Sequence, residues 1–252
     1  MSKKYKKNYL DNVVLRIDFE EVEDARLKVF LNKLEDIFPY KTKEEGIEES
    51  VKIDIKGNKV TNNRKKIPTW IYLDAYKNKK VTVTPGFVAI EYLNRSYRDS
   101  KELRDDCCKI INTSITDLSI SSVKRLGLRY VNRFDLDAGI KESIKWNDFF
   151  SKDLVGSVSF ANKMRYPIVR AMSNLHIRSD GCDILVRYGI WNQDFPSENN
   201  RKEFILDIDI FSRIALENMG EIANVVKDFN QNAEKIFEKS IGVEIKKILV
   251  KK

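Results

Sequence analysis

Three arginines share one face of a predicted strand in the middle of the chain, and their type and spacing suit them to bind a charged ligand. The segment KRLGLRYVNRFDL, residues 124–136, places Arg125, Arg129 and Arg133 on one side, because successive strand residues point to opposite faces. The other side carries apolar residues for a core: Leu126, Leu128, Tyr130 and Phe134. Arg16 stands on a comparable N-terminal strand. Guanidinium groups bind phosphates and carboxylates, so these four arginines form the candidate binding surface.

Two aspartates on a later strand offer a second kind of chemistry. Asp207 and Asp209 share one face of the segment 204–211, and Asp18 lies on the same predicted strand as Arg16. Carboxylates grouped in this way can hold Mg²⁺ for phosphoryl transfer or nucleic-acid cleavage. They can also pair with the arginines across a sheet, where each opposite-charge pair contributes ~0.2–1 kcal/mol. We prefer pairing and keep a metal-dependent nuclease as the third hypothesis.

The other reactive side chains do not form a catalytic set. His176 is the one histidine, so two-histidine metal motifs are excluded, and neither GxxxxGK[ST] nor GxGxxG occurs. Cys107 falls on the apolar stripe of a predicted helix, where a thiol fills the core, and Cys108 is one step further round. The sequence therefore favours a protein without catalytic activity and without a cofactor.

The positive charge of the chain is concentrated at its two ends. The net charge is +8, from 46 Lys and Arg against 38 Asp and Glu. Eight lysines of the ends account for the whole excess: Lys3, Lys4, Lys6, Lys7, Lys246, Lys247, Lys251 and Lys252. The remainder is neutral overall, which is weaker support for nucleic-acid binding than a charged face would be.

Composition favours a globular protein of a reducing compartment. Of the 252 residues, 42% are hydrophobic and 33% are charged, as in soluble domains. The three cysteines, two of them adjacent, form neither a disulfide framework nor a zinc motif. No apolar run approaches the ~18 residues of a membrane span, and the first residues lack the apolar region of a secretory signal. We expect a cytoplasmic protein.

Apolar periodicity predicts the elements that carry these side chains. Strands are predicted at 13–19, 51–56 with a hairpin turn at Gly57-Asn58 and a short return, 69–76, 81–92 with a turn at Pro85-Gly86, 124–136, 154–161, 166–171, 175–179, 183–191 and 204–211. Helices are predicted at 24–38, 100–118 with Ser100 as its cap, 143–150 and 217–241, and polar loops at 41–50 and 62–66. The pattern predicts an α+β fold of antiparallel sheets with helices on one face. We expect two related lobes, residues 1–140 with the arginine strand and residues 141–252 ending in a long helix.

Three segments resemble a sporadically distributed prokaryotic protein family of about this size, whose function is not known. They are NYLDNVVLRIDFE near the N-terminus, RLGLRYVNRF in the middle and VVKDFNQNAEKIFEKSIGVEIKKIL near the C-terminus, and the middle one is the specific part. The chain departs from the family pattern at Asn230-Gln231, where a His-Asp-like pair is expected. The resemblance implies an accessory gene of a mobile element, or of a defence or toxin–antitoxin locus.

Taken together, these observations predict a binding protein that acts through contacts with another protein or with a second copy of itself. The alternative is a nucleic-acid-binding accessory factor. In it the arginine face, formed by Arg16, Arg125, Arg129 and Arg133, binds successive phosphates, and tyrosines stack on bases. No membrane contact is expected.

Overall fold

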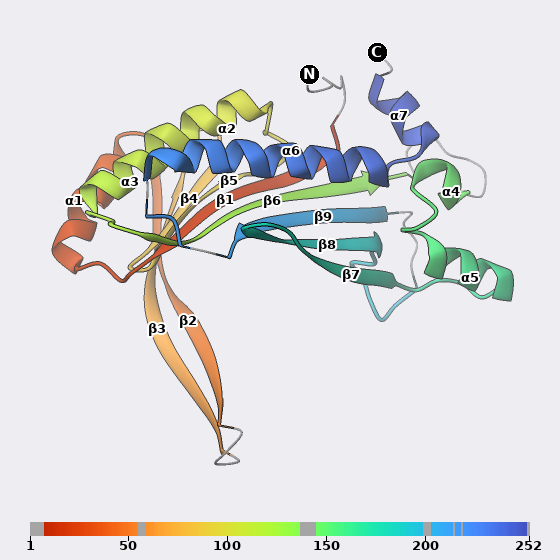
Figure 1. Ribbon diagram of the computed structural model, residues 1–252, viewed down its shortest axis with the longest axis horizontal. Helices are drawn as coiled ribbons and strands as arrows, with labels where there is room; N and C mark the ends of the chain where they lie inside the picture. Colours follow the sequence, from red (N-terminus) through yellow and green to blue (C-terminus); the bar gives the residue numbers. More distant parts are fainter. Residues whose placement is uncertain are drawn as a thin grey trace.

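The computed structural model describes residues 8–54, 59–136, 145–198, 203–213, 215–217 and 219–250. These residues form one antiparallel nine-stranded sheet, in the order β2-β3-β4-β5-β1-β6-β9-β8-β7. The long helices lie on one face of this sheet, and shorter helices gather at one end (Figure 1). The predicted α+β class, with antiparallel strands and helices on one face, is confirmed.

The elements have the following bounds. The strands are β1 (Leu10–Phe19), β2 (Tyr40–Asp54), β3 (Lys59–Leu73), β4 (Lys79–Thr84), β5 (Phe87–Tyr92), β6 (Val123–Asp135), β7 (Ala171–Arg178), β8 (Cys182–Ile190) and β9 (Glu203–Ser212). The helices are α1 (Asp24–Glu35), α2 (Ser100–Asp106), a π-helical segment (Cys107–Ile111), α3 (Asn112–Asp117), α4 (Trp146–Phe149), α5 (Gly156–Met164), a 3₁₀ segment (Met219–Glu221), α6 (Ile222–Ser240) and α7 (Val243–Val250).

Alternating apolar residues make the core between the sheet and the helices. One row of helix-side positions crosses eight strands in register: Tyr72, Val81, Ile90, Leu15, Leu128, Ile210, Ile184 and Ile177. The predicted apolar face of β6 is confirmed, because Leu126, Leu128, Tyr130 and Phe134 are all buried. The arginines of β6 therefore lie on the opposite face of the sheet, which the helices leave uncovered.

Helix positions follow their apolar stripes. Helix α1 buries Leu27, Phe30 and Leu34, and α6 buries residues at helical spacing along its length. The second predicted helix is present, but it is interrupted by the π-helical segment. Its cap is Asp99 rather than Ser100, because the Asp99 side chain accepts hydrogen bonds from the backbone of the first turn. Helix α7 follows α6 and was not predicted.

The two halves of the sheet repeat one strand order. In the first half β1 pairs with β5, then come β4 and β3, with β2 as an additional edge strand; in the second, β6 pairs with β9, then come β8 and β7. A helix follows the last strand of each half, α2 after β5 and α6 after β9. The two first strands, β1 and β6, pair with each other and join the halves into a continuous sheet.

The predicted polar loops at 41–50 and 62–66 are wrong, because both segments are strands. They belong to β2 and β3, which form a long two-stranded ribbon that extends away from the rest of the molecule (Figure 1). The described side chains of 41–47 and 62–66 are mostly exposed, so this part of the sequence lacks the apolar alternation by which strands are recognised. Cross-strand ion pairs replace apolar contacts, as between Lys66 Nζ and Glu45 Oε2 at 2.7 Å. The hairpin itself is confirmed, but its return is the 15-residue strand β3 rather than the short one predicted. The predicted turn at Gly57-Asn58 lies outside the described residues.

Two predicted strands of the second half are also wrong. The segment 154–161 lies largely in helix α5, in which Val158 is buried one turn after the buried Val155, so the spacing is helical rather than alternating. The segment 166–171 contains Pro167 and enters the sheet only at Ala171. The hairpin around Asp180-Gly181 is confirmed, since it joins β7 to β8.

No helix within the described ranges combines the length and apolar character needed to cross a bilayer.

Candidate functional site

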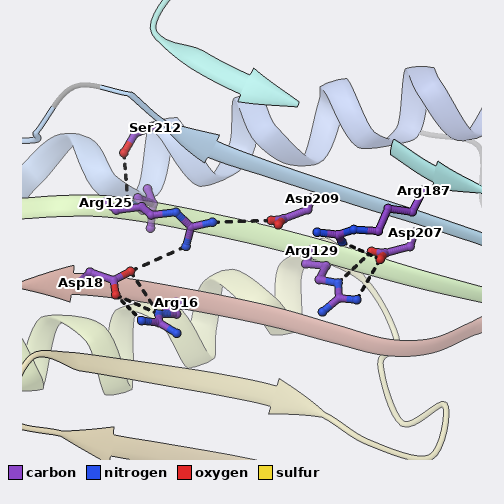
Figure 2. A network of polar contacts seen from close by, with 9 residues as sticks. Arg16, Asp18, Arg125, Arg129, Arg187, Asp207, Asp209 and Ser212 are labelled. Carbon is purple, nitrogen blue, oxygen red and sulfur yellow. Dashed lines mark hydrogen bonds and ion pairs between the residues drawn. The ribbon is translucent and has the colours of Figure 1, made fainter. Parts of the chain in front are cut away.

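The arginine face holds a network of ion pairs across β1, β6, β9 and β8 (Figure 2). At its centre the Arg129 guanidinium binds Asp207 through two hydrogen bonds, Nε to Oδ1 and Nη2 to Oδ2, both 2.8 Å long. Arg187 Nη1 donates to the same Oδ2 at 2.8 Å. The Asp207 side chain is only 4% exposed. One buried carboxylate therefore pairs with two arginines and orients both.

The rest of the network uses longer contacts and aromatic rings. Arg125 lies between two carboxylates, with Nη2 at 3.9 Å from Asp209 Oδ1 and Nη1 at 3.7 Å from Asp18 Oδ2. Its guanidinium carbon is 4.5 Å from the centre of the Phe211 ring. Arg16 forms an ion pair with Asp18. These contacts connect β9 to β1 across β6.

Arg133 extends the pairing toward the end of the sheet, where its Nη2 donates to Glu203 Oε1 at 2.8 Å. All four predicted arginines therefore lie on the uncovered face, and the structure brings them together with Asp207 and Asp209. Each of the four contacts at least one carboxylate. A phosphate ligand would have to compete with these internal partners for the same guanidinium groups.

The two aspartates of β9 have different electrostatic surroundings. Burial raises the pKa of Asp209, although Arg125 and Arg129 act in the opposite direction. The hydrogen bonds from Arg129 to Asp207 raise the pKa of the Arg129 guanidinium. Asp207 is therefore fixed as an ion pair, whereas Asp209 carries a charge that burial disfavours.

The described residues contain no group of three or more His, Cys, Asp or Glu side chains that could hold a metal ion. Both oxygens of Asp207 already accept hydrogen bonds from arginines. His176 Nε2 lies 3.1 Å from Asp183 Oδ2 at the β7–β8 end of the sheet. The buried Cys107 has its pKa raised to about 12 by burial, which suits a core thiol and not a nucleophile.

A groove on the helix side of the sheet was not predicted from the sequence. It has a volume of about 430 Å³ and lies between α2 and α6, over β6 and β9, with α7 and the segment before β1 at its borders. This volume falls in the range of ligand pockets, ~300–1,000 Å³. The groove is built from segments far apart in the chain, so no local spacing could have indicated it.

Aromatic residues form the floor of the groove. Tyr130 donates a hydrogen bond to Asn230 Oδ1 at 2.6 Å, which ties β6 to α6. Tyr97 meets the Tyr130 ring edge to face, with 5.9 Å between ring centres. Burial raises the pKa of Tyr97 to about 12 and the pKa of Tyr130 well above 10, so both hydroxyls stay protonated at neutral pH. Asn230 thus has a structural partner within this chain.

Opposite charges line the two walls. Arg98 and Lys101 lie at the start of α2 together with Asp99, whose carboxylate accepts hydrogen bonds from the backbone of the first turn, so this wall keeps a net positive charge. Glu234 and Glu238 lie on α6. Apolar surface between them comes mainly from Phe237, Leu249 and the adjacent strand residues. The groove is therefore an apolar channel with one basic and one acidic wall.

Comparison of the sequence with protein-family models and with curated proteins finds no match.

Proposed function

We propose that the chain is a non-enzymatic binding protein that acts through protein–protein contacts, and that the groove between α2 and α6 receives a segment of its partner. The observation that carries this proposal is the combination of an aromatic floor with walls of opposite charge. A protein segment with an apolar side chain flanked by an acidic and a basic residue complements all three features. A polyanion complements only the basic wall, because Glu234 and Glu238 repel phosphate.

The matched experiment reverses one charge inside the groove and one outside it. Lys101 lines the groove, and Lys109 is an exposed residue of the adjoining π-helical segment that does not. We expect Lys101→Glu to weaken capture of the partner at least ~5-fold, and Lys109→Glu to leave it unchanged. The measurement is co-expression with the products of neighbouring genes, followed by titration of the purified complex. Failure to capture any of these proteins, or equal affinity of the two variants, contradicts the proposal.

A nucleic-acid-binding accessory factor is the second candidate, and the exposure of the paired arginines favours it. The side chains of Arg129 and Arg16 remain 44% and 40% exposed, so part of each guanidinium still faces water. This function predicts binding to single-stranded RNA or DNA that weakens steeply with salt. Arg129→Ala and Arg133→Ala should each lower the salt slope by ~0.7, more than deletion of residues 1–7 does. Loss of binding on deletion of residues 1–7 alone would exclude the arginine face.

A metal-dependent nuclease built on Asp207 and Asp209 stays a third hypothesis. Magnesium would have to displace Arg129 or Arg187 from Asp207, and this exchange makes it the least favoured of the three.

We further propose that the two halves are related units, as the predicted lobes require. The repeated strand order supports this relation. We propose that the second unit begins with β6, in place of the predicted boundary at residue 140. A cytoplasmic location and an accessory role in a mobile-element, defence or toxin–antitoxin locus remain part of the proposal, supported by composition and by the family resemblance.

A further inference from the structure

The two edges of the sheet differ in how they are protected from pairing with another chain. Edge strand β2 has the sequence YKTKEEGIEESVKID, in which eight of 15 residues are charged, and charges on an edge strand oppose pairing. Edge strand β7 has the sequence AMSNLHIR, in which Arg178 is the only permanent charge. Figure 1 shows β7 at the rim of the body, with β8 on its inner side and no strand of the described residues on its outer side. The β7 edge therefore lacks the protection that β2 has.

The apolar row of the core is also left exposed to water where it reaches β7. At the other end of the sheet the row closes at Tyr72, which is fully buried and donates a hydrogen bond to the Leu31 carbonyl of α1 at 3.3 Å. At β7 it ends in Leu175, 46% exposed, and Ile177, 37% exposed. Among the described residues no helix covers this position as α1 covers β3, because α5 lies beyond the end of β7 (Figure 1). The helix-side face of β7 is an unpartnered continuation of the core.

We propose that β7 pairs with β7 of a second copy of this chain across a twofold axis, so that one sheet runs through both molecules. An antiparallel strand pair is symmetric about such an axis, and a closed two-fold interface is the commonest oligomer geometry. A copy of the chain supplies what β7 lacks, namely a neutral strand with two apolar residues on the same face. This self-association uses a surface separate from the groove and holds whether or not the groove binds a partner.

The apolar pattern selects the register of this pairing. With the axis at His176, Leu175 of each copy lies opposite Ile177 of the other, and the apolar row continues across the interface. The other face then places Asn174 opposite Arg178 and brings the two copies of His176 together. A shift of two residues would set Ile177 against Ser173 and leave fewer apolar pairs, so we assign the axis to His176.

The oligomeric state of the full chain tests the interface. Sedimentation velocity should give a particle of twice the chain mass of 29.4 kDa at micromolar concentration. Ile177→Glu should weaken the dimer at least ~10-fold, because it places charge in the row of apolar pairs. Val243→Glu is the control, since Val243 is 62% exposed on α7, and it should leave the dimer intact. A monomer at ~100 µM, or a dimer insensitive to Ile177→Glu, overturns the proposal.

Cysteine cross-linking tests the register and does not depend on how Ile177→Glu folds. Both variants carry Cys108→Ser, because Cys108 is exposed while Cys107 and Cys182 are buried. His176→Cys places two thiols directly opposite each other, within reach of a disulfide. Asn174→Cys, on the same face, separates them by ~13 Å. We expect a cross-linked dimer from His176→Cys alone. Cross-linking of Asn174→Cys, or of neither variant, overturns the assigned pairing.

Discussion

Replacement of Asp207 by Asn should lower the free energy of unfolding by about 3 kcal/mol. The Asp207 carboxylate is 4% exposed and accepts hydrogen bonds from two guanidinium groups. An amide is neutral, so Arg129 and Arg187 both lose the counter-charge of Asp207. The amide keeps one oxygen acceptor but presents N–H donors to the other guanidinium. Partial exposure of the two arginines to water keeps the loss below that of a fully buried pair. Urea unfolding followed by circular dichroism measures the difference.

Asp209→Asn is the matched control, because Asp209 lies two residues away on the same strand and the same face. Its nearest guanidinium atom in Arg125 is 3.9 Å away, and burial raises its pKa. The folded protein therefore holds the proton of Asp209 more tightly than the unfolded chain does, and stability falls as pH rises from the ordinary value of 3.8 through the raised one. At pH 7 the amide removes this penalty, so we expect Asp209→Asn to change stability by less than ~1 kcal/mol, in the stabilising direction.

The pH dependence separates the two aspartates further. The stability advantage of Asp209→Asn over the unmodified protein should grow as pH rises from 4 to 7, as the raised pKa of Asp209 requires. A loss of stability in Asp209→Asn as large as that in Asp207→Asn would show that Arg125 depends on Asp209 as strongly as Arg129 depends on Asp207. Such a result contradicts the assignment of Asp207, rather than Asp209, as the central carboxylate of the network.

Gly189→Ala should destabilise the protein by at least ~3 kcal/mol, which corresponds to a fall of roughly 6–12 °C in Tm. Gly189 lies on β8 with φ of +140°, a backbone conformation that favours glycine. A Cβ atom there would stand 1.9 Å from the carbonyl oxygen of Ala171. The start of β7 must then move away from β8. Thermal unfolding measures the loss, and faster amide hydrogen exchange in β7 should accompany it.

Gly156→Ala is the control for the glycine prediction. Gly156 begins α5 and has no neighbouring atom within 4 Å of an added Cβ. Alanine should leave the stability unchanged or raise it by up to ~1 kcal/mol, because it restricts the unfolded chain and favours helix. A Tm of Gly189→Ala within 1 °C of the unmodified protein would show that β7 adjusts freely at its first residues.

The sequence predicted the parts of the fold that carry a strong period. Strand 13–19, the arginine strand and the long C-terminal helix each have one buried face, and burial produces the period. The hairpin at Asp180-Gly181 was predicted from its turn residues, because Asp-Gly suits a tight turn between two strands. Pairing of Asp207 and Asp209 with the arginines was also predictable, because alternation alone places these residues on one sheet face. The preference for pairing over a metal site rested on that geometry.

The ribbon β2–β3, helix α5 and the groove could not be predicted in the same way. The segments 41–47 and 64–66 of the ribbon are mostly exposed, so their composition is that of a polar loop. Helix α5 is short, and its few apolar residues fit the periodicity of a helix as well as that of a strand. The groove depends on the packing of α2 against α6, which sequence spacing does not encode. Tyr97 and Tyr130 were visible as tyrosines, but only the fold places their rings together.

The pairing of β1 with β6 also bears on how the chain folds while it is being synthesised. Leu15 has Ile90 of β5 as one neighbour and Leu128 of β6 as the other. Because β5 precedes β6 in the chain, one edge of β1 can pair early in synthesis and the other edge only later. A nascent chain that has completed β5 still carries an open edge along β1, until β6 leaves the ribosome and closes it. The first half of the molecule is thus most vulnerable to wrong pairing during the time needed to synthesise residues 93–135.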